Sequence, residues 1–354
     1  MSTATESPEA AATGNSWLQQ SQAVLARLQL AQARLSQLTV TPNPSARQLR
    51  WQSGPVCLYQ YTHAAKPLAT SRAQPPLLVV FALVNRADIL DLMPEVSLIQ
   101  SLVAQGRDVW LLDWGYPTVA QAEWGLDTYV TTLLPQAIAH IGARVDLLGV
   151  CQGGTFALLY SALYPAQIRR LVMMIATIDF HTEDNLLTRW AQKLDVAAMV
   201  QQHALIPHGL LAQAFNALQP VKLQWDKIEY LLKHADDARA LAKFKAIEQW
   251  LSDGPAHVGR AFREYVSAFY QHNGFMQANV TLAGQRVDLT ALRCPVMGIY
   301  ARFDHISPLA GARALQQVLP QLRVAELEIP TGHIGTYVSA KARWIGGAIA
   351  QFLS

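Results

Sequence analysis

The chain of 354 residues is long enough for one large domain or two of ordinary size. Apolar residues make up 51% and charged residues only 15%, a composition that excludes disorder over most of the length. A net charge of +3 without a Lys/Arg-rich run argues against a nucleic-acid-binding surface. Three scattered cysteines are too few for a disulfide framework, so we expect a cytoplasmic location.

Residues 1–50 are predicted to hold a tail and one helix. Met1–Asn15 is small and polar and lacks the apolar core of a signal peptide, so we expect it to be a frayed tail. Leu25, Leu28, Leu35 and Leu38 then recur at helical spacing, which predicts a helix that packs on the domain or contacts a partner. No segment approaches the roughly 20 unbroken apolar residues of a transmembrane span.

Residues 51–178 alternate between predicted strands and helices. The apolar run Leu77–Val84 follows two prolines and is typical of a strand buried on both faces. This alternation predicts a mostly parallel sheet covered by helices on both faces. The elements predicted after the first strand are the strand Asp108–Trp114, the helix Asp127–Ile141, the strand Val145–Val150, a helix that ends at Tyr164 and the strand Arg170–Thr177.

The pattern changes over residues 179–286, which are helix-like and show no clear strand until their end. We interpret this stretch as an insertion that forms a cap over the sheet. The predicted α/β core then resumes over residues 287–354. Its elements are the strand Pro295–Ala301, the helix Leu309–Leu319, the strand Arg323–Ile329 and a last helix Ser339–Phe352.

Gly149-Val150-Cys151-Gln152-Gly153 lies between a predicted strand and a predicted helix. It matches the G-x-S-x-G nucleophile elbow of α/β hydrolases with Cys in place of Ser. The two glycines allow strand and helix to approach closely, and the helix N-terminus favours a thiolate. We therefore predict the α/β-hydrolase fold with Cys151 as nucleophile.

Two further residues follow in the chain order nucleophile, acid, histidine that this fold requires. Asp304 comes directly after one strand and His333 directly after the next. We expect His333 to act as general base and Asp304 to orient it. Asp179, which also follows a strand, is the alternative acid, and His305 is the alternative base.

The backbone N–H groups of Gln152 and of Val84 are the predicted oxyanion-hole donors, because the fold takes one donor from the residue after the nucleophile and the other from the loop after the strand Leu77–Val84. Which residue of that loop donates stays open at this point. Cys57 and Cys294 are expected to be inert buried thiols. Asp113-Trp114-Gly115 either lines the pocket or forms a turn that ends a strand. Histidines of the insertion are expected at the surface or in the cap. No metal-binding spacing is present, and we expect neither a metal nor a cofactor.

Cysteine at the elbow favours exchange between thioesters, because the acyl group moves between sulfur atoms with little change in free energy. Such an enzyme holds an acyl group covalently and transfers it to a hydroxyl group. An apolar cap that excludes water would favour this transfer over hydrolysis. The sequence therefore indicates acyl transfer from a coenzyme A thioester.

Several motifs resemble those of the polyhydroxyalkanoate synthases, in particular the short catalytic subunits of the two-component type. The resemblance covers roughly residue 50 to the C-terminus. The family's lipase-like box has Cys as nucleophile, which Cys151 matches. The motifs are FALVNRADILDL from Phe81, DVWLLDWGYP from Asp108, LLGVCQGGTFALLYSALYP from Leu147, NGFMQANVTLAGQRVDLTALRCPV from Asn273, FDHISP from Phe303 and GHIGTYVS from Gly332.

The resemblance implies polymerisation of (R)-3-hydroxyacyl-CoA, typically 3-hydroxybutyryl-CoA, with release of coenzyme A. It implies Cys151, Asp304 and His333 as catalytic residues, with the Asp activating the 3-hydroxyl group. It further implies a homodimer that works with a second, non-catalytic subunit at the surface of intracellular polyester granules. Gln152 resembles the type that is partnered by the larger accessory subunit.

Two other functions remain open at this stage. A cysteine-dependent thioesterase or lactone hydrolase would use the same residues and would give a free hydroxy acid instead of polymer. A granule-binding protein with an inactive hydrolase fold would need no nucleophile, and the three residues Cys151, Asp304 and His333 argue against it.

Overall fold

The computed structural model describes residues 8–42, 45–61 and 74–354 of the chain. Contacts between residues divide it into two compact units. The first unit combines the N-terminal region up to Thr41 with Gln219–Gln249, and the second comprises Pro42–Leu218 and Trp250–Ser354. Residues 219–249 of the predicted insertion thus group with the N-terminal helix.

The first unit consists of α1 (Pro8–Gln37), α8 (Pro220–His234) and most of α9 (Ala238–Ser252). Its small core contains the buried residues Ala31, Ala235 and Leu241, against which Leu35 and Leu38 pack. The helix predicted from the leucine spacing is therefore confirmed as α1. The expectation of a frayed tail over residues 1–15 is wrong from residue 8 onward, and residues 1–7 lie outside the described part of the chain.

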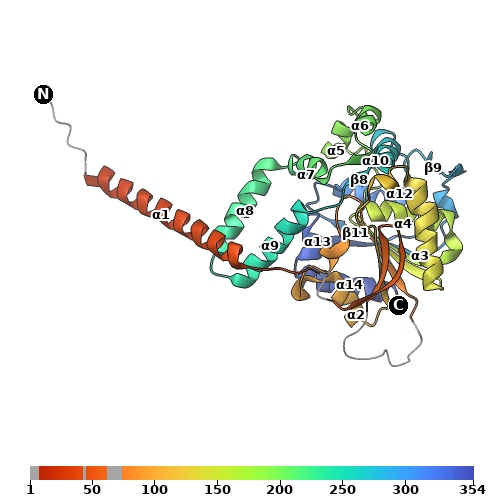
Figure 1. Cartoon of the computed structure of the whole chain (residues 1–354), viewed down its shortest axis with the longest axis horizontal. Helices are drawn as coiled ribbons and strands as arrows, with labels where there is room; N and C mark the ends of the chain where they lie inside the picture. The colour runs from red at the N-terminus through yellow and green to blue at the C-terminus, as the bar shows by residue number, and fades with distance from the viewer. Residues whose placement is uncertain (1–7, 43–44, 62–73) are drawn as a thin grey trace. The chain divides into compact units, whose positions relative to one another are not determined.

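The second unit is built on one eight-stranded sheet, in which the strands follow the order β1-β2-β4-β3-β5-β6-β11-β12. Figure 1 shows β11 of this sheet within the unit. The six strands from β4 to β12 pair in parallel, whereas β1 and β2 add an antiparallel edge. The strands are β1 (Arg47–Ser53), β2 (Val56–Tyr61), β3 (Leu77–Val80), β4 (Val109–Asp113), β5 (Val145–Val150), β6 (Ile168–Met174), β11 (Val296–Ala301) and β12 (Ala325–Ile329).

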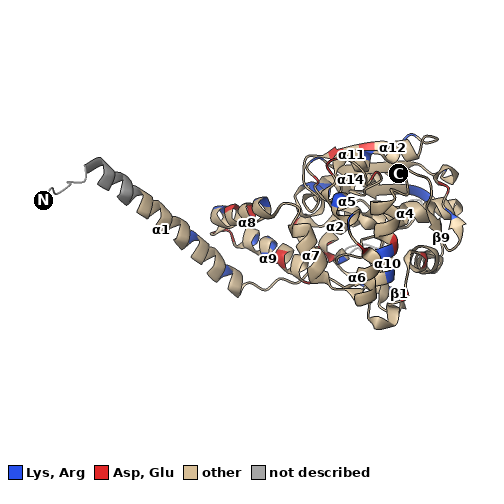
Figure 2. Ribbon diagram, turned by 90° about the horizontal axis from the view of Figure 1, so that it is seen from above, with Lys and Arg blue, Asp and Glu red and all other residues tan. Residues whose placement is uncertain are grey.

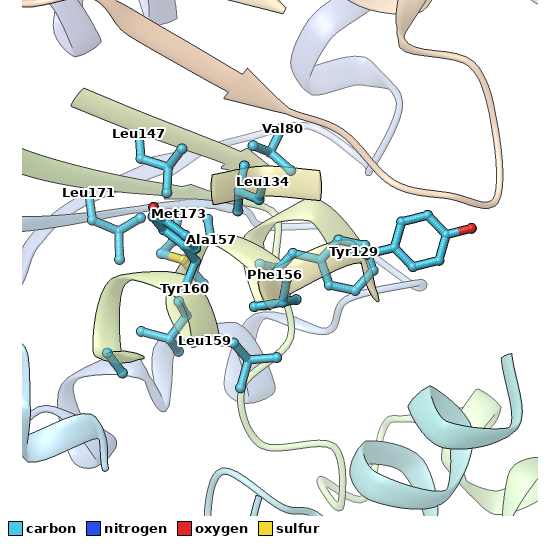
Figure 3. Close-up of a cluster of buried hydrophobic side chains, with 14 of the residues drawn as sticks. Val80, Tyr129, Leu134, Leu147, Phe156, Ala157, Leu159, Tyr160, Leu171 and Met173 are labelled. Carbon is cyan, nitrogen blue, oxygen red and sulfur yellow. The ribbon is translucent and has the colours of Figure 1, made fainter. Parts of the chain in front are cut away.

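The central strands are buried on both faces, as their unbroken apolar runs predict. Along β3, Leu78 and Val80 join the largest core cluster, and the alternating Leu77 and Val79 are equally buried on the opposite face. Side chains from the strands and the adjoining helices gather in the cluster: Val80, Leu134, Leu147, Phe156, Ala157, Tyr160, Leu171 and Met173 (Figure 3).

Helices cover the sheet, as is required when both faces are apolar. Among them, α4 packs on β3, β5 and β6, while α2 and α14 pack on each other. The helices of this core are α2 (Leu98–Ala104), α3 (Leu134–Ile141), α4 (Gln152–Leu163), α11 (Leu309–Arg313), α12 (Leu315–Val318), α13 (Gly335–Val338) and α14 (Lys341–Phe352). A π-helical turn over Thr128–Leu133 precedes α3.

Between β6 and β11, the second unit contains short helices and two small antiparallel ribbons. The ribbon of β7 (Leu205–Ile206) and β8 (His257–Val258) contradicts the expectation of no strand before the end of the insertion. A second ribbon, β9 (Thr281–Leu282) with β10 (Gln285–Arg286), lies at that end. The helices here are α5 (Leu186–Ala191), α6 (Val196–Gln202), α7 (His208–Asn216) and α10 (Gly259–Tyr265), followed by a π-helical turn over Val266–Gln271.

Several predicted boundaries are wrong for local physical reasons. The strand predicted over Leu77–Val84 ends at Val80, because the chain turns there into a loop. The strand predicted over Arg170–Thr177 ends at Met174, because Ile175 adopts a positive φ of 47°. The helix predicted over Leu309–Leu319 is split into α11 and α12. The pair β1–β2 was not predicted, since its strands are partly exposed and lack a continuous apolar run.

Charged residues are sparse along the ribbon, and both basic and acidic residues occur on α8 (Figure 2). Within the described residues, no helix is both long enough and apolar enough to span a bilayer.

Candidate active site

Cys151 lies in the turn between β5 and α4, where its backbone adopts φ 56° and ψ −127°. This left-handed conformation is costly for a residue with a side chain, and such strain is concentrated at functional sites. Its amide N–H donates to the Met174 carbonyl oxygen at 2.9 Å, which fixes the turn to the end of β6. The backbone thus holds the thiol at the carboxyl end of the sheet.

Two glycines make this turn possible. A Cβ atom on Gly149 would lie 2.5 Å from the Gly154 Cα, and one on Gly153 would lie 2.2 Å from the Val80 carbonyl oxygen. Neither distance leaves room for a methyl group. The spacing G-x-C-x-G therefore reflects steric need on both sides of the nucleophile, as its sequence predicts.

His333 and Asp304 meet at the same end of the sheet. The imidazole Nδ1 lies 2.7 Å from Oδ2 of Asp304, and both side chains are almost fully buried. The other carboxylate oxygen, Oδ1, accepts hydrogen bonds from the backbone N–H groups of Ile306 and Ser307, each at 2.8 Å. These bonds fix the carboxylate, and the carboxylate in turn fixes the ring so that Nε2 is left for another partner.

Cys151 is the second partner of the His333 imidazole. Burial alone would lower the pKa of His333, but charge interactions and hydrogen bonds with Asp304 and Cys151 raise the pKa to about 10. An imidazole that interacts with both a carboxylate and a cysteine is the arrangement expected for a cysteine nucleophile with a paired histidine. The structure thus brings together the three residues predicted as nucleophile, base and acid.

The alternative acid, Asp179, and the alternative base, His305, have other positions in the structure. Asp179 accepts hydrogen bonds from the backbone N–H of His181 at 2.9 Å and from Nδ2 of Asn273 at 2.8 Å. Its carboxylate thus ties the loop after β6 to the end of the π-helical turn over Val266–Gln271. His305 is half-buried and does not line the cavity beside Cys151. Among the described residues, the carboxylate of Asp304 pairs with His333.

An apolar cavity of about 230 Å³ opens beside Cys151. Cys151, Gln152 and Val84 form part of its wall at the sheet. The rest of the wall is largely apolar and aromatic side chains from the segment between β6 and β11, among them Leu187, Trp190, Leu194, Leu211, Phe215, Phe262 and Tyr270. Such a cavity suits an acyl chain and holds little water around the thiol.

The two predicted oxyanion donors line this cavity. Gln152 is the first residue of α4, so its N–H is among those that a helix leaves unpaired. The Val84 N–H donates to no residue in the described part of the chain. Between them, the Gln152 side chain accepts a hydrogen bond from the Leu83 N–H at 2.9 Å. The sequence did not indicate this bond.

The other singled-out residues are structural. Cys294 is buried at the start of β11, and burial raises its pKa to about 11, so its thiol is a poor nucleophile. Cys57 is only half-buried, on β2, and desolvation raises its pKa too. Trp114 packs in the core and donates from Nε1 to the Phe81 carbonyl oxygen at 2.9 Å, so the turn interpretation is confirmed for that segment.

No group of His, Cys, Asp or Glu side chains among the described residues has the geometry of a metal site.

Comparisons with known proteins show the family of the chain. The family model of the alpha/beta hydrolase fold matches residues 75–339. The chain is 40% identical over 317 residues to the poly(3-hydroxyalkanoate) polymerase subunit PhaC of Allochromatium vinosum, with 88% of each chain covered. It is 36% identical to the protein of the same name from Thiocystis violacea, again with 88% of each covered. The chain belongs to the poly(3-hydroxyalkanoate) polymerase family.

Family membership makes the chain an enzyme of the α/β-hydrolase fold and an acyl-transferring polymerase, so the predicted fold class and resemblance are confirmed. A hydrolase from Pseudomonas aeruginosa PA01 superimposes with a TM-score of 0.54 over 88% of this chain and 100% of its own length. At 16% identity this likeness concerns the fold alone.

Proposed function

We propose that the chain polymerises (R)-3-hydroxyacyl-CoA, with 3-hydroxybutyryl-CoA as its main substrate, through an acyl-Cys151 intermediate. The observation that carries this proposal is the buried Asp304–His333 pair beside Cys151, at an apolar cavity of acyl-chain character. The names of the relatives support the polymer class. The choice of monomer rests on the resemblance.

In the loading step, the Cys151 thiolate attacks the thioester carbonyl carbon. The backbone N–H groups of Gln152 and Val84 stabilise the negative charge that develops on the carbonyl oxygen. The C–S bond to coenzyme A then breaks, and the imidazolium of His333 gives its proton to the departing thiolate. Coenzyme A leaves as the free thiol, and the acyl group stays on Cys151.

In the elongation step, a 3-hydroxyl group attacks the acyl-Cys151 carbonyl. His333 Nε2 takes the hydroxyl proton, and Asp304 holds the ring and balances its positive charge. The new ester bond forms as the C–S bond to Cys151 breaks, so the thiolate is regenerated. This chemistry needs no metal and no cofactor.

The product is an insoluble polyester, so we place the enzyme at the surface of cytoplasmic granules. We further propose that it works as a homodimer and with a second, non-catalytic subunit, in line with the subunit names of its relatives.

The test is incubation with (R)-3-hydroxybutyryl-CoA, with coenzyme A release and turbidity followed together. We expect both to rise, and the recovered polymer to account for the released coenzyme A. The (S)-enantiomer serves as the control and is expected to give neither signal. Release of coenzyme A with only free 3-hydroxybutyrate as product would identify a thioesterase and reject the proposal.

A further inference from the structure

The Gln152 side chain reaches from the start of α4 to the loop after β3. Its Oε1 accepts the hydrogen bond from the Leu83 N–H, and the side chain is buried. Since an N–H group needs an acceptor, this bond fixes which end of the amide is oxygen. The Nε2 group of Gln152 must therefore point the other way, as a donor.

At that other end lies His257, which is 1% exposed. Its Nε2 is 3.4 Å from Nε2 of Gln152, and its Nδ1 is 3.0 Å from the Val258 carbonyl oxygen. A carbonyl can only accept, so Nδ1 carries the proton and Nε2 accepts from Gln152. Burial lowers the pKa of His257 to about 4, which keeps the ring neutral and this tautomer intact near neutral pH.

The two side chains join three separate pieces of the second unit. Leu83 belongs to the loop after β3, Gln152 to α4, and His257 to β8, which pairs with β7. The bond to Leu83 holds the residue immediately before Val84. The backbone N–H of Gln152 is the other proposed oxyanion donor. Gln152 therefore supplies one donor with its backbone and positions the second, the Val84 N–H, with its side chain.

We propose that Gln152 and His257 act as positioning residues that hold the Val84 N–H in place for the oxyanion. In this role their side chains act through the loop, whereas the backbone N–H of Gln152 is itself the other donor to the oxyanion. This inference deepens the proposed function, because it assumes acyl transfer at Cys151.

The test compares two reactions of the same thiol. Acylation of Cys151 by an acyl-CoA develops an oxyanion, whereas alkylation by iodoacetamide does not. Gln152→Leu keeps the approximate volume and removes both hydrogen bonds. We expect single-turnover acylation, measured by intact-protein mass after rapid quenching, to slow about 10- to 100-fold, since small displacements of positioned groups cost up to this much. Alkylation of Cys151, measured by peptide mass, should stay within about twofold of the parent rate.

Gln316→Leu is the matched control. Gln316 also accepts a backbone N–H with Oε1, from Val324 at 3.0 Å, and also donates with Nε2, but it lies on α12 and does not line the cavity. Both reactions should proceed at the parent rate in this variant.

His257 provides the second test. His257→Phe removes the acceptor and should slow acylation, whereas His257→Gln keeps an acceptor and should restore much of the rate. The double variant Gln152→Leu/His257→Phe should acylate no more slowly than Gln152→Leu alone. Both changes break the same bridge, which is the pair of hydrogen bonds that links Leu83, Gln152 and His257.

Equal losses of acylation and alkylation would show general damage to the site and would overturn the inference. Unchanged acylation in Gln152→Leu would overturn it as well. If the parent chain takes an acyl group from acyl-CoA but makes no polymer, the proposed polymerisation fails while the bridge is still tested by acylation.

Discussion

Asp304 and Asp146 are buried carboxylates at opposite ends of the same parallel sheet. Asp304, beyond the carboxyl end of β11, accepts from two backbone N–H groups and holds His333 next to the cavity. Asp146, near the start of β5, is paired with Arg107 and Arg169, and both of these arginines also donate to the Leu353 carbonyl oxygen near the C-terminus.

The difference lies in the partner of each charge. Asp146 faces two guanidinium groups, those of Arg107 and Arg169, in a buried ion-pair network whose disruption would leave a charge without its partner. Asp304 faces an imidazole, whose proton can move to a substrate. The cysteines follow the same division, since Cys151 lies at the Asp304 end of the sheet and Cys294 at the other. The carboxyl end of this sheet therefore holds the reactive groups, and the amino end holds groups that act in the fold.

The largest effect is expected from Cys151→Ala, which should abolish coenzyme A release because it removes the nucleophile. Cys151→Ser should retain at most a trace, since a hydroxyl lacks the acidity of a thiol. Cys294→Ser is the control from the opposite end and should keep most activity. The measurement is coenzyme A release from 3-hydroxybutyryl-CoA, and near-normal turnover in the Ala variant would contradict the assignment.

His333→Ala should lower the polymerisation rate at least ~10²-fold, the usual scale for a general base. It should also slow alkylation of Cys151 by iodoacetamide near neutral pH, because the thiolate loses its cationic partner. An unchanged alkylation rate would mean that the ring does not act on the thiol.

Asp304→Asn separates the two steps of the reaction. A thiolate is already a good nucleophile, so acyl-Cys151 should still form from one equivalent of substrate, as measured by intact-protein mass. Elongation requires deprotonation of a hydroxyl group, so polymer yield should fall to very little. Asp179→Asn is the matched control and should leave both steps nearly intact, since Asp179 does not contact His333. The reverse pattern would place the acid in the loop after β6.

Asp146→Ala tests the opposite end of the sheet. It leaves Arg107 buried without its carboxylate partner, so the free energy of unfolding should fall by about 3–5 kcal/mol. Asp226, in an exposed pair with Lys222, is the control, and Asp226→Ala should change stability by no more than about 0.5 kcal/mol. Urea denaturation measures both, and equal small losses would remove the distinction between the two ends.

The smallest effect concerns pH. The folded pKa of His333 is raised to about 10, above its ordinary value of 6.5. The stability that it contributes is therefore fully present below pH 6.5 and is lost as the pH rises through about 10. Over that window, the free energy of unfolding should fall more steeply for the parent chain than for His333→Gln. Parallel pH profiles for the two proteins would show that the imidazole is neutral in the folded state.

The amino-acid sequence by itself determined the features that depend on local geometry. The G-x-C-x-G turn was predictable because its glycines and cysteine are contiguous and each meets a steric or chemical need at its own position. Asp304 and His333 were predictable because each follows a predicted strand of the parallel part of the sheet, and parallel strands bring their carboxyl ends to one edge. The strands that are buried on both faces, such as β3 and β5, were predictable from their continuous apolar runs.

Tertiary structure alone decided the features that depend on contacts between distant residues. The chain order favoured Asp304 over Asp179 as the partner of His333, but only the fold of the loops at the sheet edge makes that contact. The grouping of residues 219–249 with α1 depends on contacts in a small core, where Ala31 packs with Ala235 and Leu241 from distant parts of the chain. The bridge from Gln152 to His257 joins residues 105 positions apart. A single buried histidine has no periodicity or motif to reveal it, because its role is set by what surrounds it in space.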